Sequence, residues 1–187
     1  MQIVITEVAF LTIAHQNPAT LRDLLAAGKK VPAKATTLLM QDHSAVKAMY
    51  RQYQAESDGG TKSLLARQIC TSLTVHAVVE EDVVYPEASR TLEDDEMVME
   101  AADEHGEMKV QIAKIVGGIA ADKSTTRDMT KLMRIVEHHV EGEECEMFPD
   151  LRQSGLDLYE LGSQVAASRV EALLELRRQA RAAAGQA

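Results

Sequence analysis

The sequence predicts an all-α fold with four helices at its centre. Ala, Leu, Val, Met, Glu and Lys dominate the 187 residues, and these are mostly residues that favour helices. Aromatic residues make up only 3%, and tryptophan is absent. Apolar residues recur at helical spacing, and no strand-like alternation of any length occurs beyond the first 35 residues. Glycine or proline lies at a boundary of each predicted helix, and these boundaries set the number of helical segments.

The chain divides into three predicted parts: an N-terminal leader over residues 1–35, a four-helix region over 36–150 and a helical tail over 151–187. In the leader, Pro18 is a good first helical residue, so a short helix is expected over 18–27. The four central helices are expected at about 36–54, 61–85, 93–116 and 124–148, ending respectively before Ser57, Pro86, Gly117 and Pro149. The tail helix is expected over about 157–184.

Charge and cysteine content narrow the class of protein. The formal net charge is −9, and an acidic surface without Lys/Arg clusters argues against a nucleic-acid partner, since that binding needs phosphate neutralisation. Cys70 and Cys145 make no disulfide framework, which favours a reducing cytoplasm. The apolar start of the leader lacks the basic flank of a signal peptide and is too short to span a bilayer. We therefore expect a cytoplasmic protein with no membrane partner.

A repeated histidine and glutamate pattern is the main functional signal. His76 precedes Glu80 by four residues, and His139 precedes Glu143 by four. A further histidine lies upstream of each pair at almost the same distance: His43 is 33 residues before His76, and His105 is 34 before His139. Four of the six histidines in the chain therefore belong to one scheme.

Helical spacing turns this scheme into a predicted metal site. Residues four apart on a helix differ by about 40° around its axis, so each pair offers an imidazole and a carboxylate to one point. Glu81 and Glu144 lie about 140° off that direction, and we assign them to solvent or to supporting hydrogen bonds. Six ligands suit two ions bridged by two carboxylates, and imidazole with carboxylate favours iron, with manganese as the alternative. An oxo or hydroxo bridge and a small ligand would complete the coordination.

Several neighbouring residues compete for a role. His138 lies five residues before Glu143 and points about 100° away from His139; the internal repeat favours His139. Tyr50, seven residues after His43, either approaches the metals or packs in the core, and core packing is favoured. Cys145 is expected to face away from the metals. The aromatic–proline pairs at 85–86 and 148–149 are interpreted as helix stops with core aromatic rings rather than chemistry.

These segments resemble the hemerythrin superfamily, in the branch called the hemerythrin HHE cation-binding domain. The matching stretches are Met40-Gln-Asp-His43, His76-Ala-Val-Val-Glu80-Glu81 with Tyr85-Pro86, Asp103-Glu-His105, and His139-Val-Glu-Gly-Glu143-Glu144 with Phe148-Pro149. The resemblance implies an up-down four-helix bundle around a non-haem di-iron centre. It carries the family's metal ligands to six positions: His43, His76, Glu80, His105, His139 and Glu143.

The chain departs from the oxygen-carrying members of the superfamily, which use five histidines. Lys109 stands where a second histidine of the third helix would be, and Glu143 lies one residue before the position where the carriers have Asp. The resemblance therefore implies a di-iron protein that binds or senses O2, NO or peroxide rather than an oxygen carrier. The alternatives are an enzyme that breaks down hydrogen peroxide in a catalase-like reaction, and iron handling or iron–sulfur cluster repair. A redox partner is an open expectation, as is the oligomeric state.

Overall fold

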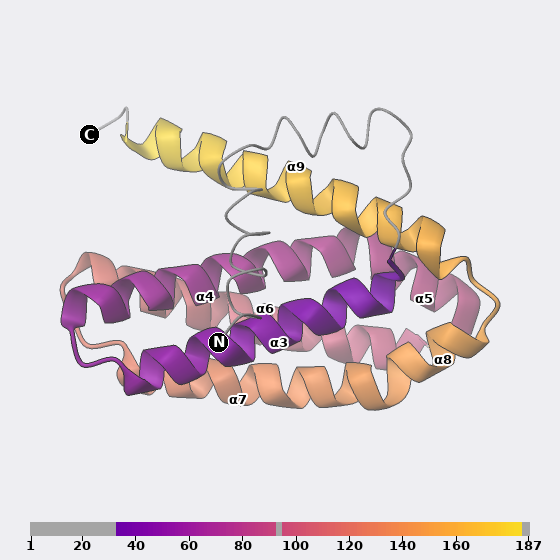
Figure 1. Ribbon diagram of the computed structural model, residues 1–187, viewed down its shortest axis with the longest axis horizontal. Helices are drawn as coiled ribbons and strands as arrows, with labels where there is room; N and C mark the ends of the chain where they lie inside the picture. Colours follow the sequence, from indigo (N-terminus) through magenta and orange to yellow (C-terminus); the bar gives the residue numbers. More distant parts are fainter. Residues whose placement is uncertain (1–32, 93–94, 185–187) are drawn as a thin grey trace.

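The computed structural model describes residues 33–92 and 95–184, and within them every regular element is helical. Four long helices lie side by side, and a fifth, α9 (Leu158–Ala184), crosses over α3 and α4 (Figure 1). The four are α3 (Ala35–Ala55), α4 (Gly59–Val79), α6 (Asp95–Ala120) and α7 (Thr126–Gly142). This confirms the predicted all-α class. The predicted leader helix over 18–27 lies outside the described residues.

The prediction that two helices end before Pro86 and Pro149 is wrong. Helix α4 runs into a π-helical turn, η1 (Glu80–Val84), and continues as α5 (Tyr85–Leu92). Helix α7 likewise runs through η2 (Glu143–Met147) into α8 (Phe148–Gln153). Each proline is the second residue of the new α-helical segment, where its missing N–H group is not needed. At these points the helices therefore change from α-helical to π-helical hydrogen bonding and continue instead of ending.

The two π-turns begin at the two glutamates of the repeat. In each, the backbone N–H of the aromatic residue donates to the glutamate five residues earlier: Tyr85 to Glu80, and Phe148 to Glu143. An i to i+5 bond widens the helix and inserts one extra residue per turn. Such turns are rare and occur frequently at functional sites.

Helix α6 passes through the glycine pair at which it was predicted to stop. Gly117 and Gly118 lie inside the helix, which ends at Ala120. The chain then reverses at Asp122, whose φ of 53° is the left-handed conformation that Asp tolerates. The stop signal therefore lay a few residues beyond the glycines.

The core consists of two apolar clusters separated by a polar layer. One cluster gathers around the start of α3, the end of α4 and α5, α8 and α9, and includes Leu39, Val79, Ala101 and Met147. The other gathers around the end of α3, the start of α4 and the facing parts of α6 and α7, and includes Val46, Leu73, Met108 and Val136. The predicted ligand positions fall between these clusters on every helix.

Helix α9 covers its own bundle. It contacts α3, α4 and η1, and its residues Leu161, Val165 and Leu173 belong to the first cluster. Close approach is possible at Gly162 because a Cβ there would lie 2.1 Å from the carbonyl oxygen of Ala33. In the described part of the chain, no helix combines the length and apolar character needed to cross a membrane.

We expect Gly162→Ala to destabilise the protein by about 1–3 kcal/mol, because the added methyl forces α9 away from the start of α3. Gly117→Ala is the matched control: it lies in an exposed part of α6 with nothing within 4 Å of its Cβ. That change should leave stability equal or raise it by up to about 1 kcal/mol. Thermal unfolding followed by circular dichroism measures both, and equal stability of the two variants would contradict the proposed close contact.

Candidate metal centre

The polar layer brings together all six residues that the sequence repeat singles out. Each has 3% or less of its surface exposed, and they come from every helix of the four-helix region. They are His43 on α3, His76 on α4, Glu80 in η1, His105 on α6, His139 on α7 and Glu143 in η2.

The four imidazoles form two pairs that meet through their Nε2 atoms. Nε2 of His43 lies 3.1 Å from Nε2 of His76, and Nε2 of His105 lies 3.3 Å from Nε2 of His139. Two ligand atoms held at about 2.1 Å from one ion, at angles of about 90–110°, lie roughly 3.0–3.4 Å apart. Each pair therefore has the spacing of two ligands on a single metal ion.

Both carboxylates reach from one imidazole pair to the other. Oε2 of Glu80 lies 3.0 Å from Nε2 of His76 and 3.3 Å from Nε2 of His105. Oε2 of Glu143 lies 3.4 Å from Nε2 of His43 and 3.4 Å from Nε2 of His139. Two groups able to hold an ion result: His43, His76, Glu80 and Glu143 form one, and Glu80, His105 and His139 form the other.

The outer nitrogen of every imidazole faces a carboxylate. The Nδ1 atoms of His43, His105 and His139 lie 2.8, 2.9 and 3.1 Å from Glu144, Glu81 and Glu104 respectively, and Nδ1 of His76 lies 3.5 Å from Asp42. A carboxylate accepts hydrogen bonds, so it fixes the proton on Nδ1 and turns the Nε2 lone pair inward. Glu81 and Glu144 thus have the supporting position expected from their angle on the helix.

The residues fit a metal because the inward-facing atoms are all acceptors. Four Nε2 lone pairs and two carboxylates converge in a buried space, and acceptors cannot bond one another. Both oxygens of Glu80 and Oε2 of Glu143 are buried without a hydrogen-bond partner among the described residues. A buried polar group without a partner is destabilising by about 1–3 kcal/mol, and more for a charged group. Cations at the two groups would satisfy all of these atoms at once.

Two aromatic rings close the centre, and sequence reasoning missed them. Tyr85 stacks on His105 with ring centroids 5.4 Å apart, and its hydroxyl donates to Oε1 of Glu143 at 3.0 Å. Phe148 stacks on His43 at 5.9 Å. Each ring follows its glutamate by five residues, which an α-helix would turn to another face. The π-turn, with its longer repeat, returns the ring to the face of the glutamate, and the five-residue offset was the available signal.

The remaining candidates lie around this centre rather than in it. His138 is 73% exposed and holds Oε1 of Glu104 at 2.5 Å. Tyr50 packs against Tyr53 in the second apolar cluster, as favoured from the sequence. Cys145 is exposed. Lys109 donates to both oxygens of Glu81 at 2.6 Å, so it steadies the carboxylate that supports His105.

Helix α9 reaches the centre through Arg169. This arginine is buried, and its guanidinium donates to Oδ2 of Asp42, the same oxygen that faces Nδ1 of His76. A contact thus runs from α9 through Asp42 to an imidazole of the centre. Charge-assisted hydrogen bonds of this kind are about twice as strong as neutral ones.

Electrostatics inside the centre favour protonated imidazoles when no metal is bound. Burial lowers the pKa of His76 and His139, but the charge of Glu80 on the first and of Glu143 on the second outweighs it. The pKa of His76 lies well above its usual value, and that of His139 rises to about 10. Burial raises the pKa of Glu80, yet His76 and the neighbouring imidazoles hold it well below normal. Burial, with the charges of Glu80 and Glu143, raises the pKa of Tyr85, so its hydroxyl keeps its proton.

Comparison with known proteins identifies the domain. A family model described as the Hemerythrin HHE cation binding domain matches residues 34–151. A curated protein called DNA nickase, from Nostoc sp. (strain PCC 7120 / SAG 25.82 / UTEX 2576), is 29% identical over 118 residues, which is 63% of this chain and 33% of that protein. The chain therefore spans about a third of that relative's length, and its name does not establish nucleic-acid binding here. No solved structure matches the chain.

Metal uptake should release protons at neutral pH. In the metal-free chain the pKa of His76 is raised well above its usual value and that of His139 to about 10, so a cation must displace protons from both imidazoles. Because that displacement becomes easier as pH rises, affinity should increase between about pH 6 and 8. Calorimetry in buffers of different ionisation enthalpy counts the protons released. A binding heat independent of the buffer would contradict the expected protonation.

Arg169→Leu should lower metal affinity by about tenfold, because Asp42 loses the donor that fixes it against His76. Arg178→Leu is the matched control on the same helix, since Arg178 is exposed and pairs with Glu175 on the surface. Competition with a chelator of known affinity measures the difference, and Arg169→Lys should restore part of it. Equal affinity in the two leucine variants would show that α9 does not act on the centre.

Proposed function

The chain belongs to the hemerythrin HHE cation-binding domain family, and on that premise we propose that it holds two iron ions and uses them to bind or sense O2, NO or peroxide. The all-helical fold and the buried histidine and glutamate groups support a metal site. An up-down four-helix bundle with a separate helical tail is our description of the architecture that carries it.

One observation supports the two-ion reading above the others: the convergence of six acceptor groups in two sets that share Glu80. A single ion cannot satisfy both imidazole pairs, because each pair has the spacing of ligands on its own ion. Two imidazoles together with the carboxylates of Glu80 and Glu143 would leave each ion short of six ligands. Mixed nitrogen and oxygen ligation without thiolate suits iron, with manganese next.

Iron ions short of full coordination supply open positions and electrons for small ligands such as O2, NO or peroxide. The residues around the centre then determine which ligands reach the ions. The two apolar clusters lie on either side of the polar layer. The four outer carboxylates hold the imidazoles in one orientation, and Phe148 covers the ring of His43. Such a buried centre favours small ligands over larger substrates.

Tyr85 favours a second candidate function, the breakdown of hydrogen peroxide. Its hydroxyl keeps its proton and lies 3.0 Å from Oε1 of Glu143 and 3.4 Å from Nε2 of His105. A buried proton held at this oxygen is the donor that cleavage of an O–O bond needs. The corresponding ring of the other half, Phe148, has no hydroxyl, so the supply of protons is one-sided.

Metal analysis with matched variants tests the proposal. We expect about two iron ions per chain in the wild type, and loss of at least one ion in Glu80→Ala and in Glu143→Ala. Glu81→Gln and Glu144→Gln should keep both ions with affinity reduced by about 10–100-fold, because they act only through the imidazoles. Retention of both ions in the Glu80 and Glu143 variants, or less than one ion in the wild type, would overturn the centre.

Optical spectra of the loaded protein separate the candidate functions. The protein is reduced without air, then exposed in turn to NO, O2 and hydrogen peroxide. A stable spectral change without turnover supports binding or sensing. Sustained O2 evolution from peroxide that falls in Tyr85→Phe supports the enzyme, and rapid loss of iron on oxidation supports iron handling.

A further inference from the structure

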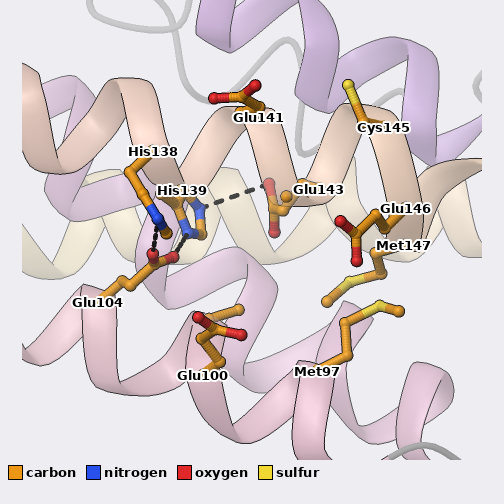
Figure 2. Close-up of a pocket in the computed structure, with 12 residues that line it drawn as sticks. Met97, Glu100, Glu104, His138, His139, Glu141, Glu143, Cys145, Glu146 and Met147 are labelled. Atoms are coloured by element: carbon orange, nitrogen blue, oxygen red, sulfur yellow. Dashed lines mark hydrogen bonds and ion pairs between the residues drawn. The ribbon is translucent and has the colours of Figure 1, made fainter.

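The two halves of the centre follow the same plan but are covered differently. Asp42 and Glu104 each precede the first histidine of a half, and each faces Nδ1 of the second histidine of that half. On the first half, Arg169 of α9 covers Asp42. On the second half, the other oxygen of Glu104 faces the exposed His138 (Figure 2). The second half therefore lacks the contact with α9 that the first half has.

A cavity of about 270 Å³ lies beside the second half, between α6 and the segment formed by α7 and η2. Its lining includes His139 and Glu143 of the centre together with residues of the surface. Glu100 points into it from α6, and Glu146 points into it from η2 (Figure 2). Both of these glutamates are exposed, so the cavity joins solvent to the buried ligands.

Glutamate is the most frequent residue in the lining of the cavity, and glutamates occur there at both exposed and buried positions. Glu100 and Glu146 lie at the mouth, Glu104 in the wall and Glu143 at the floor. Oε2 of Glu143 is buried and has no hydrogen-bond partner among the described residues. Among the described residues that line the cavity, none is a lysine or an arginine, and the two histidines, His138 and His139, both pair with Glu104. The glutamates therefore outnumber the possible positive charges, and an excess of one sign of charge between low-dielectric walls concentrates ions of the opposite sign.

We propose that this cavity is the route by which divalent metal ions reach the buried centre, with Glu100 and Glu146 drawing the ion to the mouth and Glu104 and Glu143 passing it inward. The inference rests on the proposed metal centre and adds how that centre is filled. It assigns the acidic cavity to cations rather than to the small ligands, because O2 and NO carry no charge for the carboxylates to attract, and anions would be repelled.

The test measures the rate at which the full chain, stripped of metal, takes up Co²⁺, followed by its visible absorption in stopped flow. The variant Glu100→Gln/Glu146→Gln removes two charges at the mouth. The control Asp122→Asn/Glu175→Gln removes two charges at exposed positions on the turn after α6 and on α9. We expect uptake about threefold to tenfold slower in the mouth variant at low ionic strength, with the deficit shrinking at high salt. The final metal content should be unchanged in both.

Two further measurements keep the test decisive. Release of Co²⁺ from the loaded protein to excess chelator follows the same path in reverse, and it does not depend on the stripped chain being folded. The rate of this release should change in Glu100→Lys/Glu146→Lys and should not change in the control variant. The rate of NO binding to the iron-loaded protein should be equal in the mouth and control variants.

The outcomes distinguish failure of the proposed metal route from failure of the proposed metal centre. Equal uptake and release in the mouth and control variants, with normal metal content, would overturn the metal route and leave the centre standing. A slower NO reaction in the mouth variant would reassign the cavity to the small ligand and also overturn the route. Failure of the wild type to take up metal would overturn the centre itself.

Discussion

Six buried side chains turn hydrogen-bond acceptors, four imidazole Nε2 atoms and two carboxylates, toward one another at the middle of this bundle. Atoms of this kind repel one another, and without metal they are tolerated only when protons are taken up, as the raised pKa of His76 and of His139 indicates. The rest of the architecture follows from this constraint. Two separate apolar clusters enclose the polar layer, four outer carboxylates hold the imidazoles, and two π-turns aim the glutamates.

The halves of the centre support each other crosswise. Glu81 and Tyr85 of the first half contact His105 of the second, while Glu144 and Phe148 of the second contact His43 of the first. Each half therefore depends on the other to hold its first imidazole, His43 or His105. This explains why the repeat occurs as a pair. The two halves differ at Tyr85, whose hydroxyl has no counterpart on Phe148, and at Arg169, which contacts Asp42 of the first half.

Much of this arrangement was predictable from residue spacing. A four-residue step on a helix is local geometry, so the pairs at His76 and His139 and the angle of Glu81 could be inferred from the sequence alone. The π-turns could not, because an extra residue in a helix is stabilised by what the following segment contacts and leaves no propensity signal. Missing them led to two false helix ends and hid the role of Tyr85. The contacts of Asp42 and Glu104 join different helices, which spacing along one helix cannot reveal.

Arg169 gives the tail helix a part that its place on the outside of the bundle does not suggest. Its guanidinium and the His76 imidazole use the same oxygen of Asp42, although the matched family domain ends at residue 151. Two equilibria that share an atom are thermodynamically linked, and linkage works in both directions. A molecule that bound α9 and shifted it would therefore change the metal affinity of a centre that it does not contact. Metal binding at the centre would in turn change the affinity of α9 for that molecule.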